Sequence, residues 1–391
     1  MISFIKEEIL LWKYLKTAGK PIVLYGTGDG ADKVAARLAA EEVNVAGVFA
    51  SDEFVRGQQF YGHTVRKYSE LVSMDTPVIV LICFASELPE QLERFYRLAQ
   101  IHETYAPHVP VFAGDGITDF AWLAEHESEL QDVYDRLADD FSRNVFAAVL
   151  NYRISGKLKY LQDCTTDRAQ DLKTIFAFGS AETYVDAGAF SGDTIEEFLQ
   201  LIEHKNYKRI FAIEPDPKNY KKLTTYVKDN QLANITCVQA GVWNDCGVLE
   251  LTGNGGRQST LYRMEGPDRV KELQFGDTGL WGVGSKRPVK SRKIKRQQVA
   301  VVTIDRVLDH NHADYMKFDV EGAEKEALAG AKMHLVPDRH GNLPKLLIAA
   351  YHHDEDIFAL PLLLWKMRPD YKIYLRKHPY VPAWEINFFA N

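Results

Sequence analysis

Residues 184–194 (Y-V-D-A-G-A-F-S-G-D-T) have the residue types of a ligand-binding turn. Apolar residues lead into two glycines, and glycine lets the backbone approach a ligand that a Cβ would exclude. Asp186 is expected at the carboxyl end of the strand, the edge at which open α/β sheets bind their ligands. The residues that we expect to contact a ligand here are Asp186, Gly188, Phe190, Ser191, Gly192, Asp193 and Thr194.

A second acidic pair follows one strand–helix–strand unit later. The predicted strand 209–213 ends in Glu214-Pro215-Asp216, where an acid can hydrogen-bond both hydroxyls of a ribose. The glycines at 188 and 192 are four apart, unlike the G-x-G-x-x-G of dinucleotide sites. Asp186 directly before them would repel a pyrophosphate but suits a cationic amino-acid group. The spacing therefore favours S-adenosylmethionine, and a tight turn without a ligand is the plain alternative.

Further motifs complete a resemblance to a known family. They are F-A-I-E-P-D (211–216), A-G-V-W-N (240–244), the pair Ser259-Thr260, M-K-F-D-V-E-G-A-E (316–324) and Y-H-H (351–353) followed by Y-x-I-Y-L-R. Together with 185–194 they resemble the FkbM family of S-adenosylmethionine-dependent methyltransferases over about residues 180–390. The resemblance implies a class I α/β fold with a seven-stranded, Rossmann-like sheet and an antiparallel last strand. It also implies S-adenosyl-L-methionine as cofactor, bound in addition by Glu214, Pro215, Asp216, Gly241 and Val242.

Methyl transfer to a sugar hydroxyl requires a base, because such a hydroxyl does not ionise unaided near neutral pH. Histidine titrates near that pH, so we expect His352, which aligns with the histidine of the family's Y-H motif, to be the base. Asp319 and Glu321 follow the predicted strand 314–319 and Lys317 lies within it, so these three are further catalytic candidates. Plain alternatives are that His352 only hydrogen-bonds backbone and that Glu321 only caps a helix. No fixed ligand spacing marks a metal site, and we expect none.

The N-terminal segment contains a second glycine turn. A predicted strand 21–25 leads into Gly26-Thr27-Gly28-Asp29-Gly30-Ala31 and a helix over 32–40, and a strand over 43–49 ends near Asp52. Gly26, Gly28, Ala31 and Asp52 formally satisfy the dinucleotide fingerprint, and Gly30 belongs to the same candidate site. The segment, with further strands at 77–84 and 109–113, is similar to small nucleotide-binding domains of sugar-modifying transferases. A nucleotide-sugar is the first candidate ligand, NAD the second, and an empty structural turn remains open.

The pattern along the chain predicts three parts: a smaller Rossmann-like α/β domain (1–114), a helical bridge (115–180) and a methyltransferase domain (181–391). Apolar residues recur at helical spacing in the bridge, and strand and helix alternate after it. The predicted strands of the last part lie near 184–187, 209–213, 235–239, 314–319, 345–351, 371–376 and 385–390. A glycine-rich insertion, 252–298, is predicted to be a long loop. Its segment 285–296 has seven basic residues and no acidic one, which indicates a solvated loop or a patch that steers an anionic acceptor.

Composition limits the function. A net charge of −7 and a pI near 6.0 do not favour nucleic acid as a partner. The four cysteines lack metal or redox spacing, residues 1–15 suit a short amphipathic helix better than a signal peptide, and no apolar run is long enough to span a membrane. We therefore expect a cytoplasmic O-methyltransferase acting on a hydroxyl of a sugar, glycan or other small molecule. The alternatives are a nucleic-acid 2′-O-methyltransferase and a non-catalytic protein that binds S-adenosylmethionine or a nucleotide-sugar; the sequence does not predict an oligomeric state.

Overall fold

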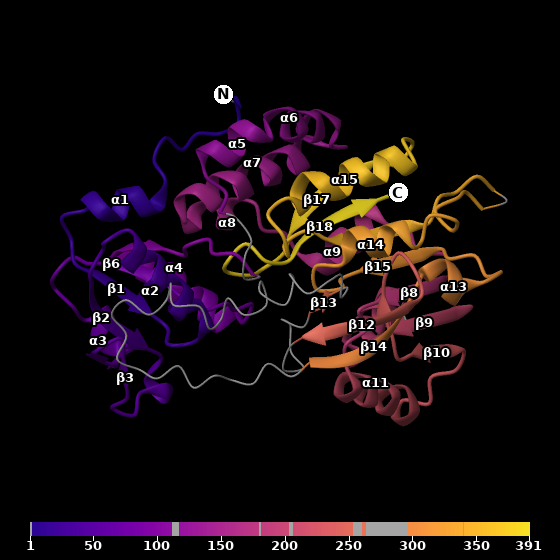
Figure 1. The fold of residues 1–391 in the computed structure, drawn as a ribbon, viewed down its shortest axis with the longest axis horizontal. Coiled ribbons are helices and arrows are strands. Elements are labelled where there is room, and N and C mark those ends of the chain that lie inside the picture. Colours follow the sequence, from indigo (N-terminus) through magenta and orange to yellow (C-terminus); the bar gives the residue numbers. More distant parts are fainter. Residues whose placement is uncertain are drawn as a thin grey trace.

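The computed structural model describes residues 2–111, 117–179, 181–202, 206–252, 260–262, 296–338 and 340–391. Two sheets lie side by side in Figure 1, the parallel N-terminal one in indigo to purple and the mostly parallel C-terminal one in pink through orange to yellow. Several helices lie above both. The mixed α/β class that the sequence predicts is confirmed.

The N-terminal sheet has five parallel strands in the order β5-β2-β1-β6-β7. Its central strands β1 and β6 are buried along their whole length, as expected for a parallel sheet beneath crossover helices. Strand order reverses between β1 and β6, directly beside the first glycine turn. The elements of this part are α1 (Leu11–Thr17), β1 (Ile22–Tyr25), α2 (Asp29–Ala40), β2 (Val45–Ala50), η1 (Asp52–Phe54), β3 (Gln59–Phe60), β4 (His63–Thr64), β5 (Arg66–Lys67), α3 (Tyr68–Val72), β6 (Ile79–Ile82), α4 (Pro89–Ile101) and β7 (Glu103–Tyr105).

Two local predictions in this part are wrong. The edge strand is β7, whereas residues 109–111 are not a strand and 112–113 lie outside the described residues. Pro107 precedes that stretch and Pro110 lies within it, and proline has no backbone N–H to donate to a sheet. The first helix begins at Leu11, so most of residues 2–10 are not helical.

Five helices connect the two sheets, as the apolar spacing predicts. The longest, α7, is buried over most of its surface and packs against the edge strand β17 of the second sheet. Ser142 Oγ accepts the N–H of Leu375 at 3.0 Å, and Arg376 donates to Asp139 Oδ2 at 2.7 Å. This helical segment is therefore a packed layer rather than a free linker. Its helices are α5 (Phe120–Glu125), α6 (Glu127–Arg136), α7 (Asp140–Ser155), α8 (Leu158–Asp163) and α9 (Arg168–Ile175).

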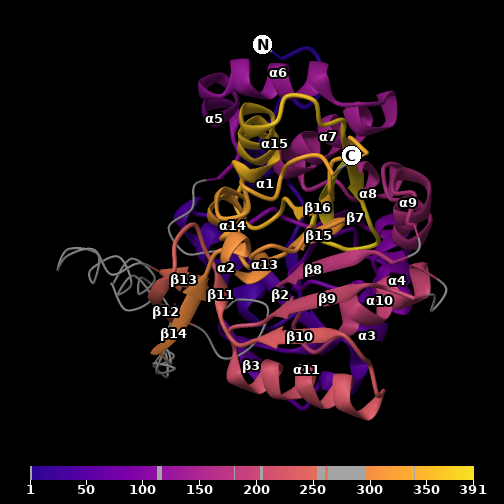
Figure 2. The ribbon, with the colours of Figure 1, turned by 90° about the vertical axis from the view of Figure 1, so that its right-hand side faces the viewer.

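The second sheet has seven strands in the order β10-β9-β8-β15-β16-β18-β17, and β18 is antiparallel to both of its neighbours. Each strand predicted after residue 180 coincides with one of them, and Figure 2 shows β8, β9 and β10 running beside one another. Strand order reverses between β8 and β15. The elements are β8 (Thr183–Ala187), α10 (Asp193–Leu201), β9 (Arg209–Ile213), α11 (Pro217–Asp229), β10 (Ile235–Val238), α13 (Ile304–Leu308), β15 (Tyr315–Phe318), α14 (Glu324–Ala329), β16 (Lys345–Ala349), α15 (Asp356–Met367), β17 (Ile373–Lys377) and β18 (Ile386–Ala390).

A small four-stranded sheet, β11-β14-β12-β13, projects from this part. The predicted loop 252–298 begins and ends in it, so its two ends are strands, while residues 253–259 and 263–295 lie outside the described residues. All of the basic segment 285–296 except Arg296 falls there as well. The strands are β11 (Gly241–Val242), β12 (Gly247–Thr252), β13 (Thr260–Tyr262) and β14 (Arg296–Val302).

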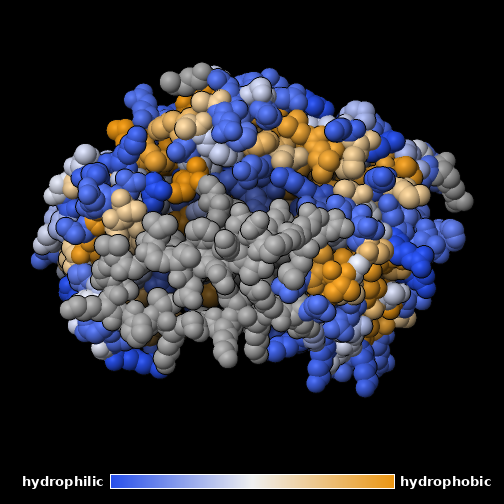
Figure 3. Space-filling view, in the orientation of Figure 1, coloured by the Kyte–Doolittle hydropathy of each residue, from blue (hydrophilic) through white to orange (hydrophobic). Residues whose placement is uncertain are grey.

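The surface mixes polar and apolar residues. Figure 3 shows small hydrophobic patches scattered among hydrophilic residues on one face. Among the helices of the described ranges, none combines the length and the apolar character that a membrane crossing requires.

Candidate functional site

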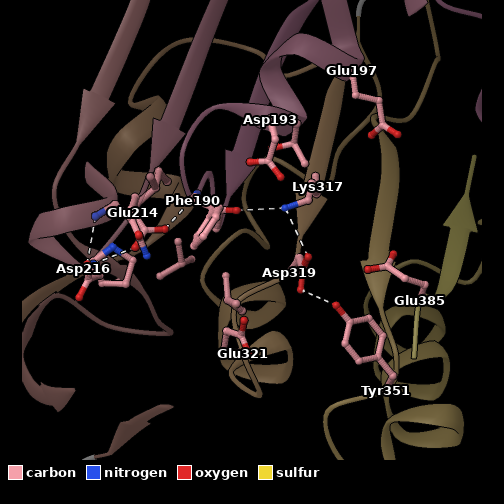
Figure 4. Close-up of a pocket in the computed structure, with 18 of the residues that line it drawn as sticks. Phe190, Asp193, Glu197, Glu214, Asp216, Lys317, Asp319, Glu321, Tyr351 and Glu385 are labelled. Atoms are coloured by element: carbon pink, nitrogen blue, oxygen red, sulfur yellow. Dashed lines mark hydrogen bonds and ion pairs between the residues drawn. The ribbon is translucent and has the colours of Figure 1, made fainter. Parts of the chain in front are cut away.

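A cleft of about 460 Å³ opens at the carboxyl ends of β8, β9 and β15, where strand order in the larger sheet reverses. Ligands of open α/β sheets bind at this position. Figure 4 shows side chains from these strand ends pointing toward one another across it. The predicted site residues that line it are Gly188, Phe190, Asp193, Thr194, Glu214, Pro215, Asp216, Gly241, Val242, Lys317, Asp319 and Glu321.

The glycine turn forms the wall above β8. Gly188 has a φ of +91°, which glycine adopts readily, and a Cβ on it would overlap the carbonyl oxygen of Asp319. Phe190 has a φ of +44°, uncommon for a residue with a side chain. Its N–H donates to Glu214 Oε2 at 3.0 Å. A hydrogen bond thus connects the turn after β8 to Glu214, the acid that directly follows β9.

Glu214 is 6% exposed and lines the cleft. Its other oxygen accepts the N–H of Asp216 at 2.9 Å. Burial outweighs these hydrogen bonds and raises the pKa of Glu214 to about 7. Asp216 is used differently, because its Oδ1 accepts the N–H groups of Lys218 and Asn219 and caps α11. Of the two acids predicted to bind a ribose, Glu214 is the better placed.

Asp186 lies beneath the cleft rather than in it. It is fully buried, accepts a hydrogen bond from Thr194 Oγ1, and lies 3.4 Å from Lys317 Nζ. Lys317 Nζ also donates to the carbonyl of Gly188 at 3.1 Å and lies 3.7 Å from Asp319 Oδ2. Burial opposes the charge of Lys317, but Asp186 and Asp319 outweigh it and raise the pKa of the ammonium. The cation that Asp186 meets in this structure is therefore the internal Lys317, and a contact of Asp186 with a cofactor stays a prediction.

His352 lies behind the cleft. It is 3% exposed and lines a small hollow of about 20 Å³ that shares Glu321, Tyr351 and Glu385 with the cleft. Its Nδ1 lies 3.0 Å from Glu324 Oε1. Burial alone would lower the pKa of His352, but Glu324 foremost, with Glu321 and Asp319, raises it to about 10. In this arrangement the imidazole is charged near neutral pH, which differs from the neutral base expected from the sequence.

Ser191 and Gly192 complete the turn without lining the cleft, and Gly192 precedes the first residue of α10. A Cβ on Gly192 would lie 2.6 Å from the ring of Tyr226, so packing explains this glycine.

Sequence reasoning missed several residues of the site. Arg168 from α9 donates to Glu197 at 2.6 and 3.1 Å and lies 3.6 Å from Glu385, and all three line the cleft. Glu87, from the N-terminal part, also lines it. Glu324 lies within the motif 316–324, so the sequence contained a signal for it, but no local pattern marks the others.

The N-terminal candidate residues Gly26, Gly28, Gly30 and Asp52 do not line this cleft or the hollow beside it. A Cβ on Gly30 would overlap the carbonyl oxygen of Cys83, which follows β6. Asp52 Oδ1 accepts the N–H of Ser69 in the first turn of α3 at 3.0 Å. Both observations describe packing of the turn, and a ligand there stays a prediction.

The mixed α/β fold, with a cleft where strand order reverses, is consistent with a methyltransferase-like fold. Residues 186–360, somewhat less than half of the chain, match the Methyltransferase FkbM domain. The crystal structure of methyltransferase FkbM from Methylobacillus flagellatus superposes with a TM-score of 0.65, at 22% identity, over 95% of this chain and 90% of that one. That likeness shows a shared fold.

Other solved structures match a smaller part of the chain. They include a putative rRNA-methylase from Clostridium thermocellum (TM-score 0.32, 13% identity, 58% of this chain and 97% of that one). Precorrin-6y C5,15-methyltransferase from Geobacter metallireducens is similar at the same score and identity, over 58% of this chain and 92% of that one. No curated protein matches the chain at a significant level.

Proposed function

We propose that the protein is an S-adenosylmethionine-dependent O-methyltransferase that acts on a hydroxyl of a sugar, glycan or other small molecule. The observation that carries the proposal is Glu214, a nearly buried carboxylate that ends β9 and lines the cleft of the FkbM-matching segment. A carboxylate in this position suits the two hydroxyls of a ribose. In this proposal the strand order of the larger sheet is that of the class I methyltransferases.

The charge of the cleft supports a cationic cofactor. The basic side chains that line its described walls are Arg168, Lys317 and His378. The acidic ones are more numerous, eight in all: Glu87, Asp193, Glu197, Glu214, Asp216, Asp319, Glu321 and Glu385. Such walls favour a ligand with a sulfonium and an ammonium group and disfavour a phosphate. Glu214, Asp193 and the turn 188–194 would hold the cofactor, which supplies an electrophilic methyl group when bound.

The residues of this chain would then align the acceptor and receive its proton. Asp319 and Glu321 line the cleft, so they are better placed than His352 to accept a proton from a bound hydroxyl. Burial opposes ionisation of Asp319, but Lys317 and His352 hold the pKa of its carboxyl below the usual value. Lys317 would keep Asp319 oriented, and Arg168 would fix the wall formed by Glu197 and Glu385.

The same charge distribution favours a neutral, hydroxyl-rich acceptor over nucleic acid. An anionic acceptor would depend on the basic segment 285–296, almost all of which lies outside the described residues. We further propose the three parts 1–114, 115–180 and 181–391 as the domain division, supported by the sheet, helices and sheet that fall within them.

Calorimetric titration with S-adenosylhomocysteine tests the cofactor, and transfer of a labelled methyl group to a panel of sugars and glycans tests the reaction. We expect binding at micromolar concentration and label in at least one hydroxylated acceptor. Absence of binding in a protein that is folded by circular dichroism would refute the proposal. Label on an amine, or on RNA with a steep salt dependence, would refute the assigned acceptor.

A further inference from the structure

His352 is held in one orientation by a buried carboxylate. Glu324 is 1% exposed, and its two oxygens accept the N–H groups of Val320 at 2.8 Å and Gly322 at 3.1 Å. Its Oε1 lies 3.0 Å from His352 Nδ1. A carboxylate that fixes the Nδ1 side of an imidazole in this way is a recurrent partner of histidines that bind metal ions through Nε2.

The Nε2 side of His352 faces two carboxylates at the wall of the cleft. It lies 3.6 Å from Glu321 Oε2 and 3.8 Å from Asp319 Oδ1. These separations exceed the 2.7 to 3.2 Å of ordinary hydrogen bonds. They match the roughly 3 to 4 Å between two ligands that each lie about 2.1 Å from a shared ion. Donor atoms of Asp319, Glu324 and His352 all lie within 4.8 Å of one another. Glu321 is not a member of that compact group and meets it through His352 Nε2.

Asp319 also has a supporting partner. Tyr351 donates its hydroxyl to Asp319 Oδ1 at 3.2 Å, and Lys317 Nζ lies 3.7 Å from Oδ2. Glu321 adopts a φ of +56°, and backbone strain in a residue with a side chain often marks a functional position. The ligand atoms thus come from the turn after β15 and the residue after Tyr351, two segments that meet at the edge of the sheet.

We propose that His352 Nε2, Asp319 and Glu321 form a binding site for one divalent transition-metal ion, with Glu324 as the residue that positions the imidazole. The ion would replace the Nε2 proton of the charged imidazole, which is released on binding. One imidazole and two carboxylates suit Zn²⁺ or Mn²⁺ better than Ca²⁺ or Mg²⁺, which prefer oxygen ligands throughout. The sequence did not reveal the site because its ligands follow no fixed spacing. Two of the three ligands line the cleft, so the ion would lie at its wall.

The ion site adds to the proposed function. Only the effect of the ion on an acceptor hydroxyl rests on that function. An ion at this wall would coordinate an acceptor hydroxyl and lower its pKa. With Asp319 and Glu321 bound to the ion, the proton would pass to a carboxylate that is not a ligand, such as Glu385, which lines both the cleft and the hollow. Binding of the ion itself does not require that the protein transfers methyl groups.

The test is a titration of the chelator-treated full chain with Mn²⁺ alone, followed by the electron paramagnetic resonance signal of free Mn²⁺. We expect one Mn²⁺ per chain, displaced by Zn²⁺ but not by a tenfold excess of Ca²⁺. Glu321→Gln and His352→Gln should each weaken binding at least tenfold, and Glu324→Gln about tenfold to a hundredfold. Glu197→Gln is the matched control, because this cleft carboxylate pairs with Arg168 instead.

Glu321 has a side chain that is 27% exposed, so its variant is expected to fold even if those of buried residues do not. No Mn²⁺ binding by the wild type, unchanged binding in Glu321→Gln, or equal weakening in Glu197→Gln would overturn the site. S-adenosylhomocysteine is titrated into the same samples. Binding of S-adenosylhomocysteine without binding of Mn²⁺ would refute the ion site alone. Binding of Mn²⁺ without binding of S-adenosylhomocysteine would refute only the proposed function.

Discussion

The turns after β1 and β8 occupy equivalent places in two parallel sheets, each beside the point where strand order reverses. Around the first turn, the ring of Phe84 lies against Gly26, and Asp52 accepts a hydrogen bond from a backbone N–H of α3. Around the second, Glu214 and Asp319 line a cleft. Glycine spacing therefore describes the backbone of such a turn, whereas a cleft beside it also depends on which side chains surround it. The acids near the second turn line a cleft, and a ligand at the first turn stays a prediction.

The largest difference in stability between the two turns is expected when their nearby aspartates, Asp186 and Asp52, are replaced. Asp186→Asn should lower the free energy of unfolding by about 3 to 5 kcal/mol, because it removes a partner of the buried Lys317 ammonium. Asp52→Asn should change it by no more than about 0.5 kcal/mol, since asparagine keeps an accepting oxygen at an exposed position. Urea unfolding measures both. Similar losses in the two variants would contradict the contrast.

A second pair of variants replaces one glycine in each turn, Gly188 and Gly28. Gly188→Ala should cost about 2 to 4 kcal/mol, since a methyl group would overlap the carbonyl of Asp319 at a positive φ. Gly28→Ala should cost about 0.5 kcal/mol or less, because nothing lies within 4 Å of its Cβ position. Thermal melts of both proteins test this. A stable Gly188→Ala protein would mean that the turn can relax.

The two acids should also respond to pH with opposite sign. The pKa of Glu214 is raised from 4.5 to about 7, so its contribution to stability is complete below pH 4.5 and is lost as pH rises through 7. Relative to Glu214→Gln, the wild type should lose about 2 kcal/mol between pH 5 and pH 8. The pKa of Asp52 is lowered by the N–H of Ser69, so its contribution is lost as pH falls below that of an ordinary aspartate. Urea unfolding compares the wild type with Glu214→Gln from pH 5 to pH 8, and with Asp52→Asn from about pH 5 down to about pH 3. A flat difference in either range would show that the corresponding assignment is wrong.

The smallest effect concerns the cofactor. Glu214→Gln should weaken S-adenosylhomocysteine about tenfold, as a charge-assisted hydrogen bond becomes a neutral one. Asp52→Asn should leave that affinity unchanged, and titration calorimetry compares them. If Asp52→Asn weakened binding equally, the first turn would belong to the cofactor site.

Alternation of strands and helices was sufficient to place the strands of the larger sheet, because each is a short buried run between polar turns. Most of the expected cleft residues follow from the same pattern, since parallel strands end at one edge. The small sheet around β12 and β14 could not be foreseen, because its strands pair across a long glycine-rich stretch.

The side chains that sequence reasoning missed share a physical reason. Arg168 reaches Glu197 and Glu385 only through tertiary packing between α9, α10 and the turn before β18. The placement of Asp186 beneath the cleft likewise depends on Lys317, which pairs with it across neighbouring strands. Such contacts leave no periodic signal in the chain.

The junction between the two sheets limits how far the protein can be divided. Ser86, next to the cleft residue Glu87, exchanges two backbone hydrogen bonds with Val381 at 2.8 and 3.0 Å. Residues 378, 379 and 385 of that second segment line the cleft as well. A fragment that starts at residue 181 would keep all the strands of its sheet but lack one wall of the cleft and the support of another. The cleft is therefore built by residues from distant parts of the chain, and trimming to the matching segment 186–360 would remove Glu87 and Arg168 from its lining.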